Sequence, residues 1–144
     1  MKRIKFSLWK KYGAHNSTPV FDAFEHGATA NGHSVVYDSP DADVNCIWSV
    51  LFNGRMAPNK EIWKQKKPTI VLEVGGINRG KTWKVGLNGI NRDAYFGPGG
   101  NSSSRAERLG LVLKPWRTDG EYILICGQHE KSQQWESMPN MTCL

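Results

Sequence analysis

Short apolar runs recur along this chain, separated by stretches whose apolar residues are spaced as on one face of a helix. The β-branched and aliphatic composition of the runs predicts strands, and the spacing between them predicts helices. Such alternation favours a three-layer, Rossmann-like α/β domain over residues 1–144, with a mostly parallel sheet of about five or six strands flanked by helices. The expected strands cover residues 3–9, 33–38, 44–52, 69–74 and 122–126, and the expected helices cover residues 19–31, 57–67 and 103–109.

The most informative stretch is residues 68–82, PTIVLEVGGINRGKT, in which an apolar run ends in a glycine-rich, basic turn. The continuous apolar run is typical of a strand that is covered on both faces. Gly75 and Gly76 then end the strand. From Gly75 onward the residues match the phosphate-loop pattern, which closes in Gly-Lys-Thr. A nucleotide triphosphate site is therefore the first hypothesis.

A true phosphate loop requires a helix directly after its lysine, because the N–H groups and the dipole of that helix face the phosphates. Residues 83–91, WKVGLNGIN, are rich in glycine and asparagine and predict no helix. The triphosphate hypothesis is therefore disfavoured, and nucleotide binding by this loop stays an alternative. We expect Gly75 and Gly76 to let the backbone approach a ligand closely, and Arg79 or Lys81 to meet an anion.

Ligands in open α/β sheets bind beyond the carboxyl ends of the strands. Applied to the expected strands, this rule gathers polar clusters at one edge of the sheet. Loops are polar in any domain, so this convergence fits a binding site and also fits an ordinary solvated edge. The clusters are residues 13–16, 38–41, 53–55, 75–81 and 128–130.

Two histidines in those clusters are candidates for chemistry. His15 lies in the first strand-to-helix loop, where a general base could act, although an exposed histidine without a function fits the same position. His129 and Glu130 could form an acid and base pair or a sugar-binding pair. The chain has no metal-ligand spacing and no Ser/His/Asp set, so we expect no metal and no cofactor. The candidate ligand-binding residues are Gly75, Gly76, Arg79, Lys81, Gln128, His129 and Glu130.

Composition describes the setting of the protein more than its function. The net charge of +6 favours anionic partners, but the lysines are scattered, which is more typical of a soluble surface than of a binding stripe. Cys46 and Cys126 lie in apolar runs and are expected to be buried thiols in a reducing compartment. No stretch approaches the roughly 20 apolar residues that span a bilayer, and the amino terminus does not resemble a signal peptide. We therefore expect a soluble, cytoplasmic protein with no membrane span.

The carboxyl half carries a family resemblance. The runs EVGGINRGKTWKVGLNGINRDAYFGPGG (residues 73–100) and GLVLKPWRTDGEYILICGQHEKSQQW (residues 110–135) resemble glycosyltransferase-like proteins of marine bacteriophages and some bacteria. These proteins are similar to GT-B enzymes, in which two Rossmann-like domains bind the acceptor and, mainly in the second domain, the nucleotide-sugar donor. The resemblance covers essentially the whole chain as the amino-terminal domain, and a phage-encoded member would work in the cytoplasm of its host cell.

The resemblance implies that the second domain is absent and that the chain alone is inactive as a transferase. In a complete protein the edge loops would line the acceptor side of a cleft between the domains, with a sugar acceptor or a nucleotide-sugar as the partner. An exposed cleft face would also allow self-association. The resemblance makes His15 the first candidate base and makes Gly75, Gly76, Arg79, Gln128 and His129 the wall of the cleft.

The main alternative comes from another class of protein. A non-catalytic module could hold nucleic acid or another protein through the basic loop around Arg79, Lys81 and Lys84. Nucleic acid is the less favoured partner because the positive charge does not form a continuous stripe. Strong dependence of binding on salt would distinguish such a module from half of a sugar-binding cleft.

Overall fold

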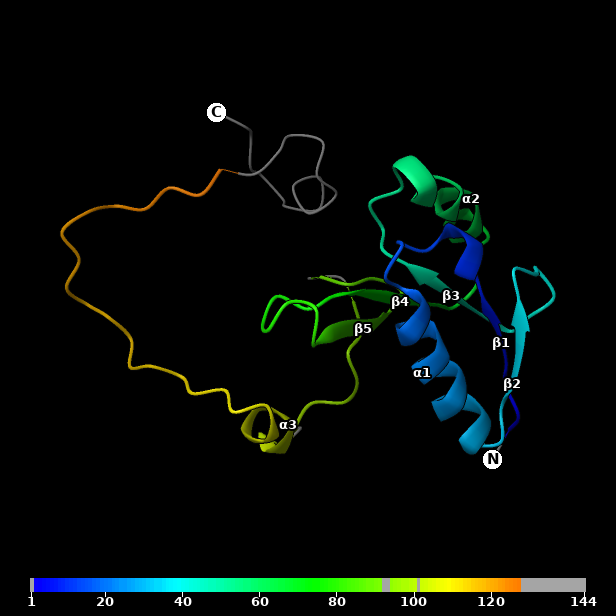
Figure 1. The fold of residues 1–144 in the computed structure, drawn as a ribbon, viewed down its shortest axis with the longest axis horizontal. Coiled ribbons are helices and arrows are strands. Elements are labelled where there is room, and N and C mark those ends of the chain that lie inside the picture. Colours follow the sequence, from blue (N-terminus) through cyan, green and yellow to red (C-terminus); the bar gives the residue numbers. More distant parts are fainter. Residues whose placement is uncertain (1, 92–93, 101, 128–144) are drawn as a thin grey trace.

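The structure is a computed structural model that describes residues 2–91, 94–100 and 102–127, and the sheet in these residues has five strands (Figure 1). They lie in the order β2-β1-β3-β4-β5, so β3 is central and β2 is at one edge. The first four strands run parallel to one another, whereas β5 runs antiparallel to β4. The strands are β1 (Lys5–Leu8), β2 (Ser34–Tyr37), β3 (Val44–Trp48), β4 (Thr69–Val74) and β5 (Trp83–Leu87).

The described residues also contain three α-helices, each at a place where the sequence predicts one. α1 connects β1 to β2, α2 connects β3 to β4, and α3 follows the sheet. The expected α/β class with a mostly parallel sheet is therefore confirmed. The helices are α1 (Thr18–Ala30), α2 (Asn59–Lys64) and α3 (Ser104–Arg108), and the short 3-10 helices η1 (Lys10–Tyr12) and η2 (Gly54–Met56) follow β1 and β3.

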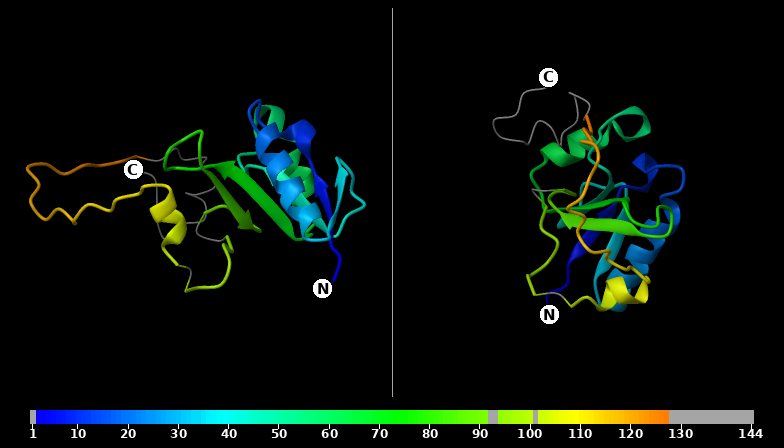
Figure 2. Two further views of the ribbon diagram at one scale, coloured as in Figure 1. Left: turned by 60° about the horizontal axis from the view of Figure 1, so that its bottom comes forward. Right: turned by 90° about the vertical axis from the view of Figure 1, so that its left-hand side faces the viewer.

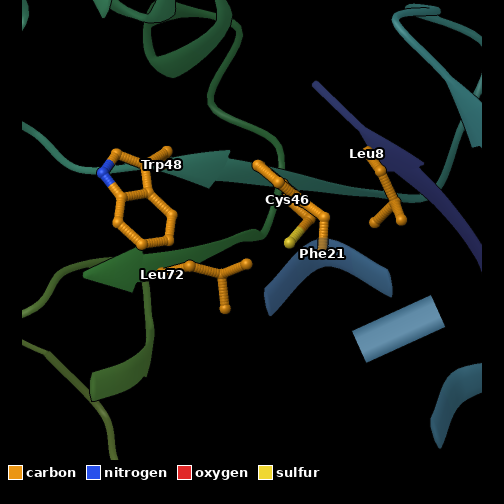
Figure 3. Close-up of a cluster of buried hydrophobic side chains, with 5 residues drawn as sticks. All are labelled: Leu8, Phe21, Cys46, Trp48 and Leu72. Carbon is orange, nitrogen blue, oxygen red and sulfur yellow. The ribbon is translucent and has the colours of Figure 1, made fainter. Parts of the chain in front are cut away.

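Neighbouring residues of a strand point to opposite faces of its sheet, and β3 divides the core in this way. Cys46 belongs to a buried cluster that includes Phe21 of α1 (Figure 3), whereas Ile47 belongs to a second cluster that includes Ile62 of α2. α1 and α2 therefore pack against opposite faces of the sheet. The first cluster contains Leu8, Phe21, Cys46, Trp48 and Leu72, and the second contains Trp9, Ile47, Ile62, Val71 and Ile90.

The central strand is shorter than the sequence predicts, because it ends at Trp48 and not at Phe52. Ser49 has a φ of 62° and Phe52 a φ of 41°, and the left-handed region is incompatible with a continuing strand. The amide of Ser49 still donates to the carbonyl oxygen of Leu72 at 2.8 Å before the chain leaves the sheet. This early exit gives a longer loop after β3, and that loop contains Arg55.

Residues 83–87 form a strand that is not among those expected from the sequence. β5 pairs with β4 in a hairpin whose first pair is Val74 with Trp83 and whose last is Ile70 with Leu87. The prediction that no helix follows Lys81 is therefore confirmed. β5 also occupies the place beside β4 that a further strand of the sheet would need.

The expected last strand, residues 122–126, is not formed. The stretch from Leu111 to Gly127 has no helix or strand and arches away from the sheet (Figure 2). Ile123 and Leu124 are 90% and 76% exposed. An apolar run becomes a strand only when a neighbouring strand pairs with its backbone, and none of the described strands lies beside this one.

The two cysteines of the described residues have opposite environments. Cys46 is completely buried, as expected, and this burial raises the pKa of its thiol far above the ordinary value. Cys126 is exposed, so the expectation that it is buried is wrong, because the strand that would have buried it is not formed. In the described part of the chain no helix has the length and apolar character needed to cross a membrane.

Candidate functional site

The order in which successive strands join the sheet reverses between β1 and β3. β1 continues through α1 to β2 on one side, whereas β3 continues through α2 to β4 on the other side. The loops that follow β1 and β3 therefore diverge toward opposite faces, and open α/β sheets bind ligands at such a reversal point. We call this place, formed by residues 9–17 and 49–59, the reversal point.

Two side chains from the two loops meet at the reversal point. Nη1 of Arg55 lies 3.4 Å from Nδ1 of His15, and Nε of Arg55 donates to the carbonyl oxygen of Lys11 at 3.1 Å. Both side chains belong to residues that are exposed. The sequence placed His15 and Arg55 in separate polar clusters, and the fold brings these clusters together.

The loop that carries His15 is fixed by its neighbours. Ser17 is buried, and its hydroxyl donates to the carbonyl oxygen of Ala14 at 2.7 Å and makes no helix cap for α1. A Cβ on Gly13 would collide with the Ser17 hydroxyl and lie 3.1 Å from the Phe21 ring. Gly13 therefore allows a close turn between η1 and α1, which sets the position of His15.

Two further residues, Asp38 and Asn59, hold peptide groups of η1 from other parts of the chain. Oδ1 of Asp38, which follows β2, accepts from the amide of Lys11 at 3.3 Å. Nδ2 of Asn59, at the start of α2, donates to the carbonyl oxygens of Trp48 at 2.9 Å and Tyr12 at 3.4 Å. The reversal point is thus a cross-linked structure in which the loops after β2 and β3 and the start of α2 each bond to the loop after β1.

Asn59 is also chemically unusual. It is completely buried, and its Oδ1 has no hydrogen-bond partner among the described residues. Buried acceptors are nearly always paired, so an unpaired one commonly marks a place where water or another group binds. Nothing in the sequence distinguished Asn59 from other asparagines, apart from its position at the start of a predicted helix.

A guanidinium group only donates hydrogen bonds, so the contact with Arg55 makes Nδ1 of His15 an acceptor. In the neutral ring the proton then lies on Nε2, which becomes a donor. With Nδ1 engaged and Nε2 protonated, the ring has no free lone pair. In this geometry His15 can orient a ligand, and taking a proton as a base requires that Arg55 first move away.

The glycine-rich loop has a different role from the one that its pattern suggests. A Cβ on Gly75 would lie 2.7 Å from the carbonyl oxygen of Thr82, so this glycine permits close approach within its own hairpin. The Thr82 hydroxyl donates to the carbonyl oxygen of Ile77, which closes the turn. Gly76 faces open space. The loop therefore shows the geometry of a β-hairpin connection and not that of a phosphate loop.

The other predicted site residues either lie apart from His15 or fall outside the residues that the structure describes. Arg79 and Lys81 are exposed in the hairpin, and no hydrogen bond or ion pair within residues 2–91 joins them to His15 or Arg55. Gln128, His129 and Glu130 lie outside the described residues. Searching the described residues for groups of histidine, cysteine and carboxylate side chains that could hold a metal ion finds none.

An open hollow of about 310 Å³ lies at the opposite, amino-terminal edge of β4. It is separate from the reversal point, and its Lys67 already donates to the carbonyl oxygens of Pro40 at 2.6 Å and Ala42 at 3.1 Å. The convergence of side chains from several loops makes the reversal point the better candidate. The hollow is lined by Trp63, Lys66, Lys67, Pro68, Thr69 and Asn88.

Comparison with known proteins adds no family to this description. The chain matches no protein-family model, and neither curated proteins nor solved structures give a significant match. The candidate site therefore rests on the geometry of the chain itself.

Proposed function

We propose that the chain is a three-layer, Rossmann-like domain of the acceptor-side type found in GT-B glycosyltransferase-like proteins, and that it binds a sugar-like ligand at the reversal point. The observation that carries the proposal is the contact between His15 and Arg55, which come from loops on either side of the reversal. The resemblance of residues 73–100 and 110–135 supplies the protein class.

The chemistry of the reversal point suits a ligand with many hydroxyl groups. Nε2 of His15 and the remaining N–H groups of Arg55 are donors, and a sugar hydroxyl accepts and donates equally well. Tyr12 stacks on Trp9 with ring centroids 6.2 Å apart, and both rings pack in the second core cluster, so they hold the loop that leads to His15 in place.

In a complete enzyme this domain would hold the acceptor while the donor domain stabilises the leaving diphosphate. His15 would first orient the acceptor hydroxyl, and would take its proton once Arg55 had turned to the ligand. The chain alone is expected to lack transferase activity, because GT-B enzymes bind the donor mainly through the second domain. Glycosyl transfer from a UDP-sugar by purified residues 1–144 would contradict the assignment to the acceptor side.

Binding can be tested on the chain directly by two-dimensional NMR with a panel of glucose, galactose, N-acetylglucosamine and UDP-glucose. We expect chemical shift changes to concentrate in residues 9–17 and 49–59. His15→Gln removes one hydrogen bond and should weaken binding about tenfold. His26→Gln is the matched control, since His26 is an exposed histidine within α1. Binding that shifts other residues, or no binding at all up to ~10 mM, would overturn the proposal.

A second candidate function is favoured by the β4–β5 hairpin. Trp83 is 41% exposed there, and the exposed residue Lys81 lies in the turn just before it, whereas Lys84 points to the opposite face of β5. Basic and aromatic side chains together form sites for single-stranded nucleic acid. This function predicts affinity for an oligonucleotide that falls steeply with salt and weakens in Lys81→Gln, and weak, salt-independent binding would exclude it.

A further inference from the structure

We infer that the ligand at the reversal point carries an anionic group, a carboxylate or a phosphate, which Arg55 binds with help from His15 and Lys11. This inference rests on the proposed function, because it specifies the class of sugar that the domain accepts. Its evidence is the net positive charge of the side chains at the reversal point, whereas the proposed function rests on their hydrogen-bond donors.

The guanidinium of Arg55 is held in place but is not neutralised. Its Nε–H is engaged by the carbonyl oxygen of Lys11 and one Nη1–H by His15, and neither acceptor carries a negative charge. The ion pairs of the described residues involve Lys5, Lys10 and Lys64, and none involves Arg55. The remaining N–H groups of a guanidinium form a planar fork that matches a carboxylate or a phosphate.

Lys10, which precedes Lys11 in the sequence, shows how the same region neutralises a cation that binds no ligand. Nζ of Lys10 lies 2.8 Å from Oδ1 of Asp22 and 3.1 Å from Oε2 of Glu25, both in α1. The ammonium of Lys11 instead lies 4.8 Å from the centre of the Tyr12 ring, a contact that leaves its charge in place. The acidic residues of α1 thus pair with Lys10, whereas Lys11 and Arg55 keep a net positive charge.

Asp38 is the carboxylate that bears most directly on this balance. Its Oδ1 accepts from the backbone amide of Lys11 at 3.3 Å, so it fixes the loop that Arg55 also holds. Its charge opposes an incoming anion, but two cationic side chains, Lys11 and Arg55, outweigh one carboxylate. A neutral ligand would leave this excess charge unused, whereas an anionic ligand would be bound by charge-assisted hydrogen bonds, which are about twice as strong as neutral ones.

Arg55 could instead serve only as a structural clamp on the Lys11 carbonyl group. A clamp needs the Nε–H alone and is indifferent to the charge of a ligand. The two explanations therefore differ in one measurable property, which is the preference of the site for an anionic sugar over a neutral sugar of the same shape.

The test measures binding of glucose, glucuronate and glucose 6-phosphate to the chain by NMR titration, with inorganic phosphate as a fourth probe. We expect glucuronate or glucose 6-phosphate to bind about tenfold more tightly than glucose, with the larger gain showing which anion the site prefers. Added salt should reduce the gain. Arg55→Gln should abolish the preference, and Arg105→Gln, which changes an exposed arginine of α3, should keep it.

Each outcome has a distinct meaning. Equal binding of glucose and the anionic sugars overturns this inference and leaves the proposed sugar-binding function intact. Inorganic phosphate that shifts residues 9–17 and 49–59 in the absence of any sugar binding supports the anion site and overturns the sugar function. If Arg55→Gln fails to fold, Lys11→Gln replaces it, because the exposed Lys11 side chain can change while the backbone hydrogen bonds of this residue remain. The inference is overturned if the folded variants bind the anionic sugars with the same preference as the natural chain.

Discussion

Two apolar runs of this chain have similar composition and opposite environments. β4, with the sequence TIVLEV, is among the most buried strands, and Val71 and Leu72 are 0% and 1% exposed. The run YILIC, residues 122–126, is almost fully exposed. Because β-branched and aliphatic residues favour strands in both runs, strand propensity does not explain the difference.

The neighbours of each run explain it. β4 pairs with β3 on one side and with β5 on the other. Its two faces are covered as well, because Leu72 packs with Trp48 in one cluster and Val71 with Ile62 in the other. The run YILIC has neither a paired strand nor a covered face among the described residues. Strand formation in this protein therefore depends on neighbouring strands and packing more than on local sequence.

The largest expected difference is between the two thiols. Cys46 should react with a thiol reagent only when the core opens, which is opposed by about 5–15 kcal/mol for a typical domain, and burial also raises the pKa of its thiol. Cys126 should react within minutes. Mass spectrometry of labelled peptides distinguishes them, and in denaturant both should react alike. Equal labelling rates in native buffer would show that the comparison is mistaken.

The next largest effect is expected from one substitution made in both runs. Leu72→Ala removes a buried side chain and should lower the free energy of unfolding by about 2–5 kcal/mol. Leu124→Ala acts on an exposed side chain and should change it by less than about 0.5 kcal/mol. Urea denaturation gives both values. A loss above ~1 kcal/mol in Leu124→Ala would mean that the run YILIC is buried in solution.

A smaller effect should follow from loosening the hairpin that covers one edge of β4. In Gly75→Ala the new methyl group would crowd the carbonyl group of Thr82, and we expect a loss of about 1–3 kcal/mol. Gly76→Ala is the control, because a Cβ there meets no atom. If the two variants unfold at the same urea concentration, the pairing of β5 does not depend on the close approach at Gly75.

The smallest effect concerns Glu25, a half-buried carboxylate of α1 that bonds to Tyr37 of β2 and to Lys10. The hydrogen bond from the Tyr37 hydroxyl, and then that from the Lys10 ammonium, hold the pKa of Glu25 below its ordinary value of 4.5. A lowered pKa adds stability above that ordinary value, and the contribution disappears as the pH falls through the pKa of the folded state. Glu25→Gln should therefore lose about 0.2–1 kcal/mol at pH 7 and less than that at pH 3, where more of the carboxyl group is protonated.

Glu121→Gln provides the control for this pH dependence, since Glu121 is exposed in the segment without helix or strand. We expect its free energy of unfolding to match that of the natural chain at both pH values. A loss in Glu25→Gln that is as large at pH 3 as at pH 7 would mean that packing, and not charge, accounts for the effect.

Most of the fold could be predicted because its strongest signals are local. The bounds of β4 follow from a continuous apolar run between Pro68 and Gly75, and α1 follows from Pro19 and its spaced apolar residues. β5 was not expected, because Gly86 and Lys84 weaken its strand pattern and the pairing with β4 compensates for them. The error at residues 122–126 has the opposite cause, since a strong local pattern there finds no partner.

The candidate site was harder to predict, because it depends on contacts between distant residues. The rule for open sheets placed His15 and Arg55 at the same edge, but only the order β2-β1-β3 makes their loops neighbours. Asn59 is a site residue because of two backbone carbonyl groups that come together in the fold. In contrast, the conspicuous loop at Gly75 has a clear sequence pattern, and its contacts serve the hairpin itself.

The antiparallel fifth strand has a consequence for the order in which the sheet forms. β4 and β5 are joined by a short turn, whereas every other pairing must first close a much longer loop, and short loops close fastest. We expect the β4–β5 hairpin to form in the folding transition state and to offer its free edge as a template for β3. Kinetic φ-values near one for Leu87→Ala and near zero for Val35→Ala, which lies in β2, would agree with this order, and the reverse pattern would contradict it. The stretch whose sequence resembles a phosphate loop would then serve as a nucleus for folding.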